Sequence, residues 1–221
     1  EGMKGAVVIG GHVQGLGIVR MLGYKKIPVV LMDTTGYNVA RFSKYCSRFI
    51  KMPADIFESE QKFCDFLEEK CRQYNLQDWL LFPTDDQTVA YLSRYKEKLS
   101  DYYRIWTPAW DVVEQCYNKK LTYALAEKVG VPYPQTYSSV EGDLELSDIA
   151  ADLSYPIIVK PAVRHKFTEV TRAQFYVANN PGELLDYYKL ALEIIGSDEV
   201  LIQEMIPCRP EDNTEVGIFF N

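Results

Sequence analysis

This sequence lacks long apolar runs and a surplus of positive charge, and it has few of the side chains that bind zinc. No apolar run reaches the roughly 18 residues of a membrane span, and no signal core opens the chain, so we expect neither a membrane partner nor export. The 24 Lys and Arg are outnumbered by 31 Asp and Glu, which gives a net charge of −7 and argues against a nucleic-acid partner.

Histidine and paired cysteine are also scarce. The chain has 2 His and 5 Cys, and none of the cysteines forms a C-x-x-C pair. Zinc sites are built mainly from these side chains, so we assign no metal ligand to this sequence. An odd number of unpaired cysteines is typical of reduced thiols, and it predicts a cytoplasmic location.

Alternating strands and helices fill the first half of the chain. Apolar, β-branched runs predict strands at 6–9, 28–33, 49–53, 79–83 and 104–107, and amphipathic stretches predict helices that include 58–76 and 86–103. Strand–helix alternation is typical of an α/β fold with a doubly wound parallel sheet. We therefore expect a Rossmann-like domain over residues 1–109.

The pattern changes in the second half. Two helices follow each other over 110–117 and 119–130, and later strands are expected at 156–161, 173–178 and 200–206. This mixture predicts an α+β unit over residues 110–221. An apolar strand is also expected at 214–221, and such an ending suggests that the sequence comes from a longer protein.

Two segments of the first half are candidate ligand contacts. Gly10 to Gly17 follows the first strand and could approach a phosphate, but His12 breaks the dinucleotide fingerprint, so a tight strand-to-helix turn is the alternative. Asp33 could hold a ribose hydroxyl in the first case. After the strand at 79–83, Thr84 or Asp85 either caps the next helix or contacts a small substrate.

Two lysines and a polar strand end are the candidates of the second half. Lys160 ends an apolar strand, where its charge requires either an anionic ligand or a carboxylate such as Glu204. Lys119 follows the N-cap residue Asn118 and opposes the helix dipole, which favours a bound anion unless the lysine is simply solvated. Gln203 to Ile206 could line an adenine ring through main-chain groups and apolar side chains.

Taken in order, these segments resemble the ATP-grasp superfamily, which includes biotin carboxylase, D-alanine–D-alanine ligase and the large subunit of carbamoyl-phosphate synthase. The resemblance rests on Asn118-Lys119 before a helix that ends in Gly130-Val131-Pro132-Tyr133-Pro134, on Tyr155-Pro156-Ile157-Ile158-Val159-Lys160-Pro161, on Pro181-Gly182-Glu183-Leu184-Leu185 and on Gln203-Glu204-Met205-Ile206. The first half resembles the pre-ATP-grasp domain that precedes this module. The likeness therefore spans nearly the whole chain and implies an incomplete ATP-grasp module over 110–221.

The resemblance implies ATP as the cofactor, with Lys119 and Lys160 on its phosphates. It assigns the remaining nucleotide contacts to the main chain of Glu204 and Ile206, to the side chain of Gln203 beside the adenine amino group, and to Asp212 at the ribose. In this superfamily ATP activates a carboxylate as an acylphosphate, which an amine or similar nucleophile attacks. The implied partners are those small molecules. No catalytic residue is assigned, and a homo-oligomer is left open.

Two departures from the family pattern qualify this interpretation. Residues 162–168, expected as a loop, lack the glycines of the family's flap, and the acidic magnesium ligands belong to a second lobe that would follow the hinge. We therefore expect an ATP-binding, catalytically incomplete part of a carboxylate–amine ligase. The alternatives are an NAD(P)-dependent oxidoreductase built on the first strand–helix–strand unit and a noncatalytic nucleotide-binding module.

Overall fold

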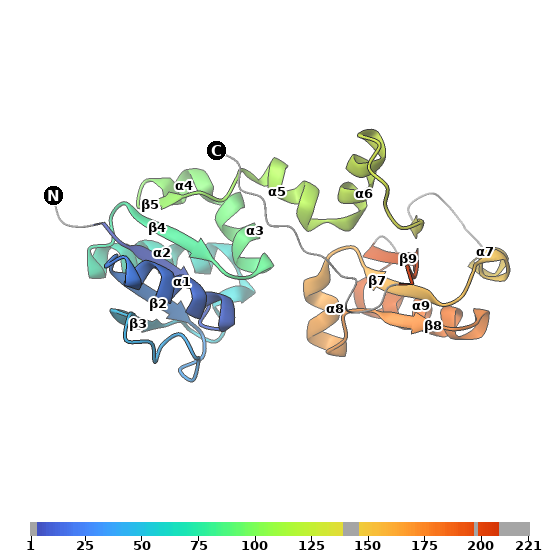
Figure 1. Cartoon of the computed structure of the whole chain (residues 1–221), viewed down its shortest axis with the longest axis horizontal. Coiled ribbons are helices and arrows are strands. Elements are labelled where there is room, and N and C mark those ends of the chain that lie inside the picture. The colour runs from blue at the N-terminus through green and yellow to red at the C-terminus, as the bar shows by residue number, and fades with distance from the viewer. Residues whose placement is uncertain (1–3, 139–145, 197–198, 208–221) are drawn as a thin grey trace. The chain divides into compact units, whose positions relative to one another are not determined.

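The computed structural model describes residues 4–138, 146–196 and 199–207. Its internal contacts divide the chain into two compact units, 1–117 and 118–221, and each is described by itself (Figure 1). Helix α5 (Trp110–Tyr117) lies in the first unit because it packs on α3 (Asp86–Arg94). The guanidinium of Arg94 on α3 lies 3.9 Å from the ring centroid of Trp110 on α5, which contributes to this packing.

A five-stranded parallel sheet forms the centre of the first unit. Its strands are β1 (Ala6–Ile9), β2 (Val29–Asp33), β3 (Arg48–Lys51), β4 (Trp79–Pro83) and β5 (Tyr103–Ile105), in the order β3-β2-β1-β4-β5. Every neighbouring pair is parallel. The predicted α/β class and its strands are therefore confirmed, with small shifts at the strand ends.

Helices cover both faces of this sheet (Figure 1). On one face, α1 (Val13–Tyr24) packs its buried Val19 with Val8 and Leu31. On the other face, α2 (Glu60–Tyr74) packs Phe63 and Leu67 with alternate residues of the same strands, and the 3₁₀ turn η1 (Ile56–Glu58) leads into it. Alternating strand residues thus serve opposite faces, as a doubly wound sheet requires.

The prediction of one continuous helix over 86–103 is wrong. The chain forms α3 (Asp86–Arg94) and then a separate short helix, α4 (Lys96–Ser100). Tyr95 interrupts the helix with φ −103° and ψ 19°, outside the helical region. The interruption lets Leu99 reach the core, where it is fully buried.

A four-stranded antiparallel sheet forms the second unit. Its strands β6 (Thr136–Ser138), β7 (Ile157–Pro161), β8 (Tyr176–Ala178) and β9 (Val200–Glu204) are arranged in the order β6-β9-β7-β8. The helices are α6 (Lys119–Lys128), α7 (Leu146–Asp152), α8 (Arg164–Thr171) and α9 (Pro181–Ile195). This arrangement confirms the expected α+β second half.

Residues 164–168 are helical, although a loop was expected there. They begin α8, and the buried Phe167 anchors this helix in the core of the unit. An apolar anchor and the absence of glycine both favour a packed helix over a mobile loop.

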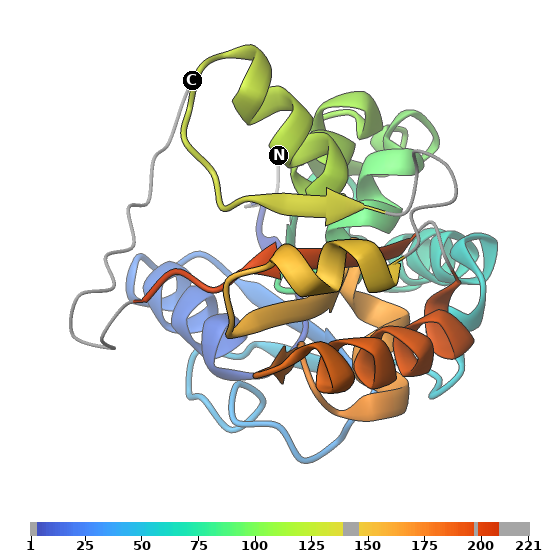
Figure 2. The same ribbon diagram turned by 90° about the vertical axis from the view of Figure 1, so that its right-hand side faces the viewer.

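The two charged strands, β7 and β9, have one core face and one polar face. Val159 and Ile202 point into the apolar core with α7 and α9, and Figure 2 shows these two helices beside each other. Lys160 pairs with Leu201 across the two strands, and Ile158 pairs with Gln203. Because side chains alternate along a strand, Lys160 and Gln203 share the face opposite the apolar core.

Among the described helices, none combines the length and apolar character needed to cross a membrane. The strand expected at 214–221 lies outside the described residues.

Candidate nucleotide-binding site

Lys160 lies at the centre of a polar cluster in the second unit. Its Nζ donates to Gln203 Oε1 at 2.6 Å and to the Tyr123 hydroxyl at 2.8 Å. Gln203 lies diagonally across the β7–β9 pair, two residues beyond the direct partner Leu201. In the described part of the chain, Lys160 therefore contacts neutral oxygens rather than a carboxylate.

Lys119 lies close to the end of the same strand. Asn118 caps α6, as expected, because its Oδ1 accepts a hydrogen bond from Lys120 N at 3.0 Å. The backbone N–H of Lys119 donates to the carbonyl of Ala162 at 3.2 Å, and Lys119 Nζ is 3.4 Å from the same oxygen. Ala162 is two residues beyond Lys160, so both predicted lysines meet where β7 ends.

Tyr123 is part of this cluster, although sequence reasoning did not select it. It follows Lys119 by one helical turn on α6, and its ring stacks on Tyr133 with centroids 5.4 Å apart. Burial opposes ionisation of this phenol, but hydrogen bonds with Lys160 and Gln203, together with the charges of both lysines, lower its pKa overall. The i, i+4 spacing from Lys119 is the sequence signal that could have identified it.

Gln203 is almost completely buried, with 4% of its surface exposed. Besides accepting from Lys160, it donates through Nε2 to Thr136 Oγ1 at 2.6 Å. Thr136 is its direct partner on β6, and the threonine hydroxyl donates to the carbonyl of Pro134 at 2.7 Å. Each polar atom of the Gln203 amide therefore has a partner from a different strand.

The predicted adenine hinge follows directly after these contacts. Glu204 ends β9, and its Oε1 accepts from Gln135 N at 2.8 Å, so the alternative of a Lys160–Glu204 ion pair is not found. Met205 and Ile206 leave the sheet and are 42% and 56% exposed. Asp212 lies outside the described residues.

The glycine turn of the first unit is tightly packed. Gly10 has φ +101°, and a Cβ added at Gly15 would lie 2.0 Å from the Gly10 carbonyl oxygen. Asp33 accepts from Gly11 N at 2.5 Å and from Thr35 N at 2.7 Å, so both of its oxygens stabilise the turn. These contacts favour the tight-turn interpretation.

The neighbouring Thr84 and Asp85 also have structural partners. Asp85 caps α3 by accepting from Thr88 N at 2.8 Å, which confirms the expected cap. Thr84 donates to the carbonyl of Ile9 at 2.7 Å and lies 2.9 Å from His12 Nε2. The two loops that follow β1 and β4 are therefore hydrogen-bonded to each other.

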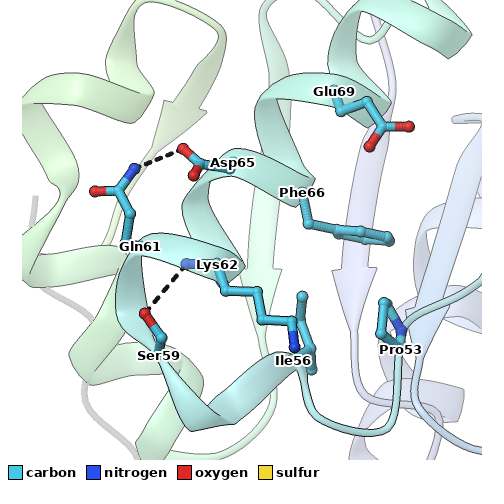
Figure 3. A pocket seen from close by; sticks show the side chains of 8 residues that line it. All are labelled: Pro53, Ile56, Ser59, Gln61, Lys62, Asp65, Phe66 and Glu69. Carbon is cyan, nitrogen blue, oxygen red and sulfur yellow. Dashed lines mark hydrogen bonds between the residues drawn. The ribbon is translucent and has the colours of Figure 1, made fainter.

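An open pocket on the first unit contains none of the predicted site residues. Side chains between Pro53 and Glu69, on η1 and α2, line it. Figure 3 shows Lys62 and Glu69 beside the apolar Ile56 and Phe66. Across the described ranges, no group of three or more His, Cys, Asp or Glu side chains could hold a metal ion. The Lys160 cluster therefore remains the best-supported candidate site.

The parallel sheet of the first unit and the antiparallel sheet of the second have the fold expected of the ATP-grasp class. Comparisons with known proteins agree. The chain is 33% identical to the large chain of carbamoyl phosphate synthase from Pyrococcus furiosus over 95 residues, which are 43% of this chain and 8% of that protein. No protein-family model matches the chain.

Solved structures match over most of the chain. An L-amino acid ligase from Bacillus licheniformis matches with a TM-score of 0.64 and 14% identity over 92% of this chain and 44% of that one. The biotin carboxylase domain of 2-oxoglutarate carboxylase from Hydrogenobacter thermophilus was solved in complex with MgADP, ADP and bicarbonate. It matches with a TM-score of 0.66 and 15% identity over 93% of this chain and 45% of that one. N5-carboxyaminoimidazole synthetase from Staphylococcus aureus, complexed with ADP, matches with a TM-score of 0.62 and 16% identity over 93% of this chain and 48% of that one.

The expected resemblance to ATP-grasp ligases is thus confirmed, and the chain has the fold of part of these ligases. The chain spans less than half the length of these three matching structures. At 14–16% identity, the match concerns the fold.

Proposed function

We propose that this chain is the ATP-binding part of a ligase that joins a small-molecule carboxylate to an amine or a similar nucleophile through an acylphosphate. The observation that supports this most is the meeting of Lys119 and Lys160 at the end of β7, beside the buried Gln203. Two ADP complexes among the matching structures share this fold.

In this proposal the two lysines bind the phosphates and stabilise negative charge as the terminal phosphoryl group is transferred. Gln203 lies beside the adenine amino group, the main chain of Glu204 and Ile206 contacts the ring, and Asp212 faces the ribose. Among the described residues, the half-buried ammonium of Lys160 contacts neutral oxygens, and such a group is well suited to a phosphate, because an ionic hydrogen bond is stronger than a neutral one.

Magnesium belongs to the proposed function because one matching structure contains MgADP. Bound magnesium would neutralise phosphate charge. The described residues of this chain offer no cluster of acidic ligands, so they do not fit a magnesium site.

The proposal also covers the two units and the cellular location. The first unit would be the pre-ATP-grasp domain, and residues 118–221 the first lobe with the start of the second. Cys46, Cys64, Cys71 and Cys116 are free thiols, which supports a cytoplasmic location.

An NAD(P)-dependent oxidoreductase is less well supported. In that alternative, the glycine turn would bind the pyrophosphate and Asp33 would bind a ribose. Asp33 is 8% exposed and its two oxygens accept from backbone N–H groups, which leaves little of the carboxylate for a ligand. The noncatalytic nucleotide-binding module shares the site and differs only in activity.

Substitution of Lys160 tests the proposal directly. In the full-length protein, Lys160→Met retains an unbranched apolar stem and removes the charge. We expect ATP affinity, measured by isothermal titration calorimetry, to fall about tenfold or more, which corresponds to at least ~1.4 kcal/mol.

Lys189→Met is the matched control, because Lys189 is an exposed lysine on α9 of the same unit. It removes the same charge without touching the site and should leave the affinity unchanged. Equal affinities in the Lys160→Met variant and the wild type would refute the proposed site.

A further inference from the structure

We propose that the outer face of α1, together with the loop that joins β2 to β3, binds an acidic amphipathic helix of a partner protein. Two features of this surface support the proposal: an apolar stripe that α1 leaves exposed, and unpaired positive charge around it. The surface belongs to the first unit, so the proposal goes beyond the proposed nucleotide site of the second.

The helix α1 is apolar on its outer face as well as on its inner one. The inner face packs Val19 against the sheet (Figure 1). On the outer face, Val13 and Tyr24 are each 75% exposed and Met21 is 59% exposed. Residues three or four positions apart lie on one side of a helix, and this spacing joins Val13, Gly17, Met21 and Tyr24. An exposed apolar stripe of this kind indicates a packing partner.

A gap interrupts the stripe at Gly17. Nothing lies within 4 Å of a Cβ added to this glycine, so the helix backbone is accessible between Val13 and Met21. Helices pack by placing side chains of one helix into gaps between side chains of the other. The gap therefore favours a helix with a large apolar side chain as the occupant.

The loop over 34–47 extends the apolar surface beside α1. Ala40 N donates to the carbonyl of Gly11, just before the helix, at 3.0 Å. Near the end of the helix, a Cβ added to Gly23 would lie 2.3 Å from Cβ of Tyr45. These contacts hold the loop along the helix, where it exposes the side chains of Tyr37, Val39 and Phe42.

Positive charge surrounds this apolar surface. Residues 1–54 contain 8 Lys and Arg but 2 Asp and Glu, whereas the whole chain has 24 and 31. None of the exposed cations on α1, directly after it or on the loop forms an ion pair with a described carboxylate. They are Arg20, Lys25, Lys26, Arg41 and Lys44. Acidic side chains of a partner would complement them.

The rest of the first unit favours a small acidic partner over an extended one. Residues 55–117 contain 13 Asp and Glu but 7 Lys and Arg. Nucleic acid or an anionic membrane would approach this acidic part as well, and like charges repel. A single helix needs only the α1 surface, which is about 18 Å long at 1.5 Å per residue. We therefore favour a protein helix.

The test measures binding of two labelled peptides to the full-length protein by fluorescence anisotropy. Each peptide has about 14 residues, is held helical by a side-chain staple and carries a stripe of leucines. One has glutamates beside the stripe, and the other has lysines. We expect the glutamate peptide to bind at least about tenfold more tightly than the lysine peptide, and added salt to weaken its binding.

Variants of exposed residues locate the binding surface. Met21→Glu places a charge within the stripe, and Arg20→Glu with Lys25→Glu reverses the charge beside it. Each should weaken binding of the glutamate peptide about tenfold or more. Arg104→Glu is the matched control, because Arg104 is exposed on β5 of the same unit, and it should leave the affinity unchanged. ATP affinity should stay the same in all of these variants.

Several results would overturn the proposal without affecting the proposed function. Absence of binding of the glutamate peptide to the wild type is one, and equal affinities in the wild type and Met21→Glu are another. Binding of phosphatidylserine vesicles or single-stranded DNA instead of the peptide would assign the surface to a membrane or to nucleic acid. Self-association that Met21→Glu abolishes, measured by analytical ultracentrifugation, would assign it to a second copy of this chain.

Discussion

At the scale of single residues, the main feature is a chain of hydrogen bonds that links Tyr123, Lys160, Gln203 and Thr136. Each link is 2.8 Å or shorter, and the chain joins α6, β7, β9 and β6. The ammonium of Lys160 is half-buried and has hydrogen-bond acceptors, but among the described residues no carboxylate neutralises its charge. A phosphate would supply the missing charge at this position.

Tyr123 should ionise at a lower pH than an ordinary tyrosine. Its lowered pKa comes from Lys160, Gln203 and Lys119, which outweigh burial, whereas burial raises the pKa of Tyr103 and Tyr117. As the pH rises, the Tyr123 phenol should therefore lose its proton before the two buried ones. A spectrophotometric titration of phenolate absorbance should show an early component in the wild type.

Tyr123→Phe should remove this early component, and Lys160→Met should shift it to higher pH. Tyr176→Phe is a control on another stacked ring, since Tyr176 stacks on Tyr187 with centroids 5.0 Å apart. An early component that persists in Tyr123→Phe would contradict the assignment.

The thiols should differ strongly in reactivity. Burial raises the pKa of Cys64 to about 12 and also raises those of Cys71 and Cys46, whereas Cys116 is exposed. Because the thiolate is the reactive form, the three raised thiols should react slowly at neutral pH. In a Cys208→Ser background, Cys116→Ser should abolish the fast phase of modification by a chromogenic disulfide; a remaining fast phase would contradict the prediction.

At the scale of elements, the close packing of α1 against β1 depends on Gly15. A Cβ at this position would lie 2.0 Å from the backbone oxygen of Gly10, and neither backbone can move without disturbing the turn. Gly15→Ala should lower the free energy of unfolding by roughly 2 kcal/mol or more, because overpacking typically costs about 1–3 kcal/mol. Denaturant unfolding measures this loss.

Gly17 provides the matched control on the same helix, because nothing lies within 4 Å of a Cβ added there. Gly17→Ala should raise the free energy of unfolding by about 0.5–1 kcal/mol, as expected for alanine in a helix interior. Equal effects of the two substitutions would show that close packing at Gly15 has no energetic role.

The elements themselves were largely predictable, because strand and helix periodicity depends on local sequence. Two exceptions have tertiary causes. The interruption at Tyr95 brings Leu99 into the core, and Phe167 fixes α8 in the core where a loop was expected. The candidate cluster was predictable only in part: Lys119, Lys160 and Gln203 lie near the same end of β7, but Tyr123 was not recognised among the chain's 16 tyrosines.

At the scale of the whole molecule, the proposed function places the described ATP contacts in the unit formed by residues 118–221. Hydrogen exchange of the full-length protein should therefore show ATP-dependent protection at the start of α6, in β7 and in β9. NADH should give no protection at residues 10–17. Protection of the glycine turn by NADH, without an effect of ATP on β7 and β9, would support the oxidoreductase instead.

Lys160 and Gln203 lie on the face of their strands that points away from the apolar core. In the proposed function, the core-facing residues of these strands therefore support folding, and the residues on the opposite face bind the nucleotide. Under the proposed function, substitutions at positions 119, 160 and 203 would abolish nucleotide binding, while Val159 and Ile202 would still hold the strands in the apolar core. A descendant of such a chain would then keep the fold without binding the nucleotide, and the residues at these three positions would show that binding had been lost.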